Sequence, residues 1–422
     1  MGTIKVPLKG WGTMKLKTAR IFACVALVGG VAVAMAPGVA SAAGKTVSDA
    51  TFNPSFSTMK YLKSVVAKGK GSIAVILPDT VSSARWVDYD APAFKKAFLA
   101  AGLKPSQFII QNGHGSPQEQ LTDAQGDIAK GAKVLILTSL DSSSGAIIES
   151  YAESRGVKVI DYDRLTLGGD RSYYVSFNNV AVGTLIGKGL LSCITSWNVA
   201  NPVVFVMKGA PTDNNATLFA EGYDAVLNAA GYNTTSGSSN TVNESVGTWT
   251  PSVALTDFQG AYSANSKINA VLTPNDENAA PIISYLQSQG LKPDTFPFTG
   301  QDATPQGIDN IISGYQCGTV FKPSFIEAQA TAALAIYLRA KEKVPAGIVN
   351  GTTTDGSATI ASLKNVPSVL LTPLWVTAAT VESQVIASKQ VTTAQLCTNT
   401  APTVAGSTQP TYAADCTKYG IK

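Results

Sequence analysis

The chain has little charge and a single histidine. Only 14% of its 422 residues are charged, and His114 is the one imidazole. A metal site built from several histidines is therefore excluded, and a Ser/His/Asp catalytic triad would have to use His114. His114 stands in Asn112-Gly113-His114-Gly115, a pattern typical of a solvated loop.

The excess of positive charge is confined to the start of the chain. The formal charge of +4 includes five basic residues within the first 20, a stretch that has no acid. Without them, 27 basic residues face 28 acidic ones, a net charge of about −1. This balance argues against a nucleic-acid partner. The 45% of hydrophobic residues excludes a disordered chain, and the length favours two domains.

Only one long apolar run is present, and it follows that basic stretch. Ile21 to Ala36 is apolar throughout and is followed by Pro37-Gly38 and by Ala40-Ser41-Ala42. The order is typical of a secretory signal peptide over residues 1–42, cleaved after Ala42, which predicts an extracytoplasmic protein, in the periplasm or at the outer face of the cell membrane. Two alternatives stay open: a retained membrane anchor, and a lipoprotein attached through Cys24.

Four cysteines remain after this leader, an even number for an oxidising compartment. Three pairings could satisfy them, and we favour Cys193 with Cys317 and Cys397 with Cys416. The second bridge would close a loop rich in Thr, Ala and Pro that has little core of its own. Buried free thiols are the alternative.

The body of the chain alternates short apolar runs with amphipathic stretches that end in glycine. This alternation predicts an α/β fold, with parallel sheets covered by helices on both faces. Glycines expected to end helices are Gly102, Gly131, Gly156, Gly231, Gly290 and Gly314. The expected strands are 72–77, 108–111, 133–137, 158–162, 173–177, 203–207, 268–272, 296–299 and 319–321.

Polar and aromatic residues follow many of these runs. Ligands of open parallel sheets bind beyond the carboxyl ends of the strands, so these positions predict a binding site. Paired Arg, Asp and Asn groups can hold neighbouring sugar hydroxyls, and a Trp ring can cover the apolar face of a pyranose. The residues are Arg85, Trp86, Asp163, Arg164, Asn178, Asn179, Asp213, Asn214, Asn215, Trp249, Asn275, Asp276, Asp302 and Lys322.

Each of these residues also has a purely structural interpretation. Asp213, Asn275 and Asp302 could be helix N-caps. Asp163-Arg164 could be an exposed turn, Arg85-Trp86 a surface pair, Trp249 a core residue and Lys322 an ordinary strand end. Their common position after successive strands favours a site.

Seven short strings, taken together, resemble the D-xylose-binding family of bacterial ABC sugar importers, which are type I periplasmic binding proteins. The resemblance runs in order from about Gly71 to Pro373. The strings are Ser83-Ala84-Arg85-Trp86, Asp161-Tyr162-Asp163-Arg164, Tyr174-Val175-Ser176-Phe177-Asn178-Asn179, Asp213-Asn214-Asn215-Ala216, Asn275-Asp276, Gly300-Gln301-Asp302-Ala303 and Phe321-Lys322-Pro323.

The resemblance implies two Rossmann-like lobes, joined by a three-strand hinge, that close on a monosaccharide. It implies ligand contacts from Arg85, Asp163 and Arg164 in the first lobe and from Asn215, Asn275, Asp302 and Lys322 in the second, with Trp86 and Trp249 on the two faces of the sugar ring. It implies no cofactor and no metal. The sequence departs from the family at Asn178, where Asp is frequent, and in the tail beyond Val376.

The order of elements predicts the domain boundaries. We expect an N-terminal linker over 43–70, a first lobe of 71–180 plus 324–365, and a second lobe of 181–323 plus 366–422 that includes the tail with its two cysteines.

These features predict a binding protein and no enzyme: a monomer that captures D-xylose or a close aldopyranose and delivers it to membrane ABC permease subunits. A sugar sensor for a membrane receptor could use the same site. A secreted carbohydrate hydrolase would need Asp163 and Asp302 as its paired carboxylates. Expected partners with Arg or Lys would lower the pKa of both carboxyls, which disfavours that reaction.

Overall fold

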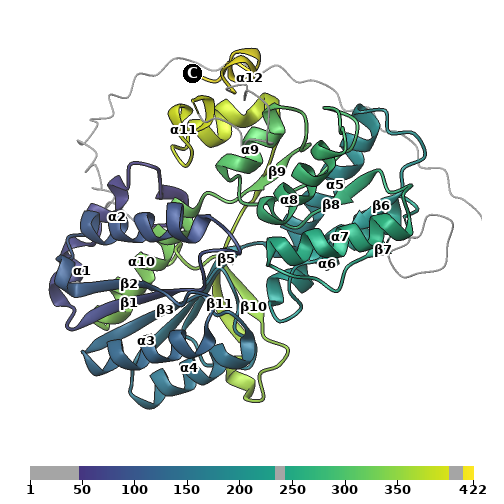
Figure 1. Cartoon of the computed structure of the whole chain (residues 1–422). Coiled ribbons are helices and arrows are strands. Elements are labelled where there is room, and N and C mark those ends of the chain that lie inside the picture. Colours follow the sequence, from purple (N-terminus) through teal and green to yellow (C-terminus); the bar gives the residue numbers. More distant parts are fainter. Residues whose placement is uncertain (1–46, 233–242, 399–411) are drawn as a thin grey trace, which may run out of the picture. The chain divides into compact units, whose positions relative to one another are not determined.

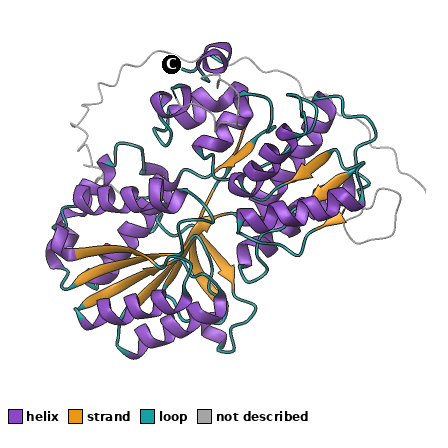
Figure 2. Ribbon diagram, in the orientation of Figure 1, coloured by secondary structure: helices purple, strands orange, loops and turns teal. Residues whose placement is uncertain are grey.

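The computed structural model describes residues 47–232, 243–398 and 412–422. The expected leader over 1–42, with Cys24, lies outside the described residues. The described chain forms two α/β lobes, each built around its own sheet (Figures 1 and 2). No helix within these ranges has the length and apolar character needed to cross a bilayer.

The first lobe contains a seven-stranded sheet of order β10-β11-β5-β4-β3-β1-β2, parallel except for the β10–β11 pair. Nearly every side chain of its central strands is buried, because helices cover both faces. The strands are β1 (Ser72–Leu77), β2 (Phe108–Asn112), β3 (Ala132–Leu137), β4 (Lys158–Tyr162), β5 (Tyr173–Phe177), β10 (Gly351–Thr354) and β11 (Asn365–Leu371).

Helices α1 and α2 pack with α10 on one face of this sheet, while α3 and α4 pair on the other (Figure 1). Their bounds are α1 (Lys63–Lys68), α2 (Ala91–Ala101), α3 (Pro117–Ala129), α4 (Ser142–Ser154) and α10 (Ser324–Ala340). The six glycines expected to end helices all have positive φ angles, as a left-handed helix end requires.

The second lobe contains shorter strands. Strands β7, β6 and β8 form a parallel sheet, which an isolated parallel bridge between Val271 and Phe298 extends, while β9 and β12 pair antiparallel. The expected strand 296–299 is thus reduced to that bridge. The strands are β6 (Val204–Val206), β7 (Asn243–Glu244), β8 (Ala270–Leu272), β9 (Thr319–Phe321) and β12 (Leu374–Val376).

Two helix pairs cover this lobe, α5 with α6 and α7 with α8. The first pair packs backbone against backbone: a Cβ on Gly183 would collide with the main chain at Phe219. The helices are α5 (Asn179–Ser196), α6 (Asn214–Ala229), α7 (Pro251–Ala264), α8 (Asp276–Ser288), α9 (Pro305–Ile312), α11 (Thr393–Cys397) and α12 (Ala413–Lys418).

Two expected boundaries were wrong. Strand β11 pairs with β5, so residues 366–371 belong to the first sheet and the last crossing follows Leu371 instead of Val366. The expected linker over 43–70 is an integral part of the first lobe in its described portion. Phe52, Met59 and Leu62 are buried in the main core, and α1 packs on α10. The segment has no strong local periodicity, so its place in the lobe is determined by tertiary burial.

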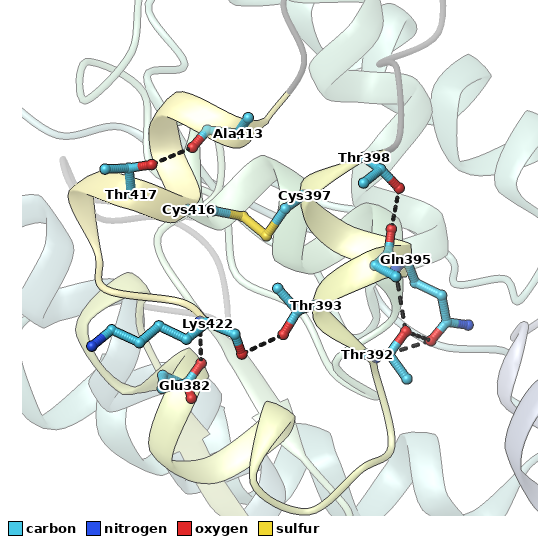
Figure 3. Close-up of a disulfide and its surroundings, with 11 residues drawn as sticks. Glu382, Thr392, Thr393, Gln395, Cys397, Thr398, Ala413, Cys416, Thr417 and Lys422 are labelled. Carbon is cyan, nitrogen blue, oxygen red and sulfur yellow. Dashed lines mark hydrogen bonds between the residues drawn. A yellow bond between two sulfur atoms is a disulfide. The ribbon is translucent and has the colours of Figure 1, made fainter.

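The four cysteines of the body are paired in two bridges. Cys193 of α5 is bonded to Cys317, with Cα atoms 6.1 Å apart, and Cys397 of α11 to Cys416 of α12, with Cα atoms 5.9 Å apart. The second bridge is drawn in Figure 3.

Candidate functional site

One cavity lies between the carboxyl ends of the strands of both lobes. All nine side chains expected to contact a ligand line it: Arg85, Trp86, Asp163, Arg164, Asn215, Trp249, Asn275, Asp302 and Lys322.

Arg85 is fixed by three carboxylates. Its Nε and Nη2 donate to the two oxygens of Asp90, each at 2.8 Å, and Nη2 also donates to Glu327 at 2.7 Å. Nη1 donates to Oδ2 of Asp163 at 2.8 Å. The side chain is only 2% exposed, which excludes the surface-pair interpretation. A guanidinium held on both edges presents its donors in a fixed plane.

Asp163 follows β4 in a left-handed backbone conformation, with φ of 62°. Its carbonyl oxygen accepts hydrogen bonds from Tyr174 Oη at 3.0 Å, Ser176 Oγ at 2.8 Å and Asn215 Nδ2 at 3.0 Å. These donors stabilise a conformation that costs free energy in a non-glycine residue. They hold the carboxylate in the cavity, where it is 3% exposed, so Asp163-Arg164 is no exposed turn.

Two residues of the second lobe meet Asp163 and Ser83 of the first. Lys322, which follows β9, places Nζ 3.1 Å from Asp163 Oδ2 and 3.6 Å from Asp302 Oδ1. Ser83 Oγ donates to Asp302 Oδ2 at 2.8 Å. Asp302 also has a left-handed backbone, with φ of 90°. The lobes are therefore in direct polar contact across the cavity.

A second ion pair crosses the cavity beside Trp249. Arg164 Nε lies 3.0 Å from Asp213 Oδ2, and the same oxygen accepts a hydrogen bond from Trp249 Nε1 at 3.0 Å. Asp213 thus fixes a cation of the first lobe and an indole of the second. Trp249 is only half-buried, and its ring packs edge-on against Phe219.

Trp86 begins the short helical turn Trp86–Asp90 and is 3% exposed. The guanidinium carbons of Arg85 and Arg164 lie 4.6 and 5.6 Å from the centroid of its ring, within the range of cation–π attraction. Its Nε1 donates to Ser82 Oγ at 3.1 Å. The indole is therefore held in place at the cavity wall.

The N-cap interpretation holds for two of the three residues to which it applied. Asp213 caps α6 and Asn275 caps α8, and both also line the cavity. Thr304 caps α9, so Asp302 is no cap. Asn275 Nδ2 additionally donates to the carbonyl of Ser82 across the lobes, at 2.8 Å.

Electrostatics keep Asp163 ionised. Burial alone would raise its pKa, but the positive charges of Lys322, Arg85 and Arg164 outweigh burial and hold the pKa well below its usual value. Burial raises the pKa of Glu327, which Arg85 offsets only in part. At neutral pH the cavity therefore offers a permanent acceptor at Asp163 beside permanent donors.

Several side chains of the cavity were not predicted from the sequence. Ser82, Ser83, Asp213, Phe219 and Gln301 also line the cavity. Asp213 follows strand β6, as expected, but it was not among the expected ligand contacts. Asp90 and Glu327 act through Arg85, and a lone acid among the apolar residues of α10 was the available signal for Glu327.

Other candidates lie outside the cavity. Asn178 is exposed and caps α5, and Asn179 donates to Asn215 Oδ1 at 2.8 Å behind the cavity wall. His114 is exposed and pairs with Glu119 at 2.8 Å. Within the described ranges, no group of three or more His, Cys, Asp or Glu side chains is arranged to hold a metal ion.

Comparison with known proteins places this architecture among sugar-binding proteins. The chain is 32% identical to the D-xylose-binding periplasmic protein of Escherichia coli K12, over 78% of this chain and 94% of the relative. It is also 32% identical to a multiple sugar-binding periplasmic protein of Azospirillum brasilense, over 78% and 92%.

Solved structures agree. A carbohydrate transporter solute-binding protein from Chloroflexus aurantiacus, in complex with D-glucose, has a TM-score of 0.66 and 27% identity, covering 77% of this chain and 98% of that one. The periplasmic binding protein domain family matches residues 73–343. The chain therefore belongs to the periplasmic binding protein domain family, with the type I fold of the ABC sugar solute-binding proteins.

Proposed function

We propose that this protein captures one monosaccharide, D-xylose or a close aldopyranose, between its lobes and releases it to an ABC permease. The observation that best supports this function is the cavity, because nine polar and aromatic side chains from both lobes meet around it. Such a site needs no catalytic group. It needs only donors and acceptors that match a ring of hydroxyls, and lobes that rotate about three crossings.

Unpartnered acceptors support a hydroxyl-rich ligand. Of the described buried acceptors that line the cavity, Asp302 Oδ1 and Gln301 Oε1 accept no hydrogen bond, although Lys322 Nζ lies 3.6 Å from Asp302 Oδ1. A buried acceptor without a donor costs free energy, and a sugar hydroxyl can donate to it while accepting from Arg85 or Lys322. Hydrogen bonds to charged groups contribute about 1.5 to 3 kcal/mol each, so a handful exceeds the roughly 8 kcal/mol of micromolar binding.

The two indoles supply the apolar part of the site. Trp86 and Trp249 come from different lobes and are both oriented by hydrogen bonds, to Ser82 and Asp213. In this proposal they cover opposite faces of the pyranose ring, whose C–H groups are apolar.

The remaining parts of the proposal concern place and partners. We place the protein outside the cytoplasm, as a monomer whose two lobes dock on permease subunits. The first lobe is taken as residues 47–180 plus 324–371 and the second as 181–323 plus 374–422.

Calorimetry across a panel of pentoses and hexoses tests the function. We expect D-xylose or a close aldopyranose to bind at micromolar or tighter affinity, and Asp302→Ala to weaken it at least tenfold. Asp257→Asn on helix α7, which lies outside the cavity, is the control and should bind like the wild type. Absence of heat with every sugar would contradict the proposal.

A further inference from the structure

The C-terminal segment, defined here as residues 382–398 and 412–422, lies beyond the part of the chain matched by the family. It is folded onto the second lobe. Its apolar side chains share a separate buried cluster with Ile308, Ile311 and Ile312 of α9. The members from the segment are Val385, Val391, Leu396, Tyr412, Cys416 and Ile421.

The segment is also closed on itself (Figure 3). The Cys397–Cys416 disulfide ties α11 to α12. Thr393 Oγ1 donates to the carbonyl of Lys422 at 2.6 Å, and the amide of Lys422 donates to Glu382 Oε2 at 3.1 Å. Its two described pieces, 382–398 and 412–422, are thus linked by the disulfide and by two hydrogen bonds of Lys422.

One side chain of this segment contacts a residue that lines the ligand cavity. Gln390 Nε2 donates to the main-chain carbonyl of Asp302 at 3.4 Å. Its Oε1 accepts from the amide of Ser324 at 3.2 Å and from the Ser324 hydroxyl at 3.4 Å. Asp302 lines the cavity, and Ser324 begins α10, two residues after Lys322. A single amide therefore joins a ligand-contacting loop to a crossing between the lobes.

The contact from Gln390 lies at a strained part of the backbone. Asp302 and Ala303 both have positive φ angles, of 90° and 50°, conformations that a non-glycine residue adopts only when its surroundings fix it. Tyr89 of the first lobe, in the turn that begins with Trp86, joins the same buried cluster. Through Gln390 the segment contacts Ser324 of the first lobe and Asp302 of the second.

We propose that the C-terminal segment is a positioning element of the sugar site and that Gln390 is its positioning residue. Resting on the proposed function, this inference assigns the segment a role in affinity: Gln390 holds the Asp302 loop in its ligand-binding conformation, and the Cys397–Cys416 disulfide holds Gln390 in place. Loss of either weakens binding chiefly by speeding dissociation, because the loop relaxes while the encounter surface is unchanged.

Two variants of Gln390 separate this role from general stability. Gln390→Ala removes both contacts. Gln390→Glu keeps an acceptor for Ser324 but loses the donor to Asp302. We expect both to raise the dissociation rate and the Kd for the sugar at least threefold. Gln395→Ala, which removes the side chain that bonds Thr392 in the same segment, is the matched control and should bind like the wild type. A Gln390→Glu variant with wild-type binding would overturn the proposal.

A measurement without sugar keeps the inference independent of the proposed ligand. Hydrogen–deuterium exchange on the full chain should show faster exchange at residues 300–304 and 324–327 in Gln390→Ala, and in the Cys397→Ser/Cys416→Ser double variant, than in Gln395→Ala. If the wild type binds no sugar, this difference still supports the positioning role while the proposed function fails. Equal exchange in all three variants would refute it.

Discussion

Lys322 of the second lobe lies 3.1 Å from Asp163 of the first, and both side chains are buried in the same cavity. The pair joins the lobes through a charge contact that a sugar hydroxyl would share. Lys322 is the positive charge that lowers the pKa of Asp163 most, so it also keeps this acceptor ionised.

Lys322→Met should weaken sugar binding at least tenfold, a loss of about 1.4 kcal/mol, because one donor disappears and Asp163 loses a stabilising charge. Calorimetry measures this directly. Lys208→Met breaks an ion pair of the same lobe, with Glu244, outside the cavity, and serves as the control. Equal affinities for the two variants would remove Lys322 from the site.

Arg164→Ala should also weaken binding at least tenfold. It deletes a cation of the cavity and leaves Asp213 buried without its ion-pair partner, so the anchor of Trp249 changes too. Stopped-flow tryptophan fluorescence with sugar reports the loss. Arg155→Ala, which removes an exposed arginine of the first lobe, is the matched control. Unchanged binding in Arg164→Ala would place this arginine outside the ligand contacts.

The pH dependence of stability should carry a signature of Asp309 on α9. Burial, together with nearby Asp415, raises the pKa of Asp309 to about 8. An acid whose folded pKa is raised favours the folded state fully below its unfolded pKa of about 3.9, and this contribution is lost as pH rises towards 8.

Asp309→Asn, which mimics the protonated acid, should therefore gain stability relative to the wild type as pH rises from about 4 to 8, with a plateau above that. The slope is at most about 1.4 kcal/mol per pH unit for one proton. Guanidinium unfolding of both proteins at several pH values measures it. Parallel curves would show that Asp309 is ionised in the folded protein throughout.

The Cys193–Cys317 bridge should contribute to stability without contributing to recognition. It spans 124 residues of sequence, and a loop of this size predicts a loss of about 5 kcal/mol in the free energy of unfolding for Cys193→Ser/Cys317→Ser. The sugar affinity should stay unchanged, since neither cysteine lines the cavity. A large change in Kd would instead couple this bridge to the site.

The sequence predicted the first sheet better than the second. In β1 the residues after Ser72 form an uninterrupted, buried apolar run, and the strand ends where the run ends. In the second lobe the apolar runs extend beyond the hydrogen-bonded ladder, so 203–207 shortens to Val204–Val206. Residues 47–70 have no such pattern, and only their burial against α10 and the first-lobe core reveals their place.

For the candidate site, position after a strand was the useful signal. Arg85, Asp163 and Lys322 could be found because each follows a strand that ends at the cleft. Asp90 and Gln390 could not, because their roles depend on contacts with Arg85 and Asp302 that no local pattern encodes. Which residues support a ligand-contacting side chain is determined by the tertiary structure, so local sequence patterns do not reveal them.

The hydrogen bonds that Arg85 donates to Asp90, Asp163 and Glu327 fix its guanidinium, and this has a stereochemical consequence. An immobile guanidinium cannot follow a hydroxyl that moves from an equatorial to an axial position. In the proposed complex, epimers that differ at the carbon facing Arg85 would be discriminated by geometry alone, without any difference in size or polarity.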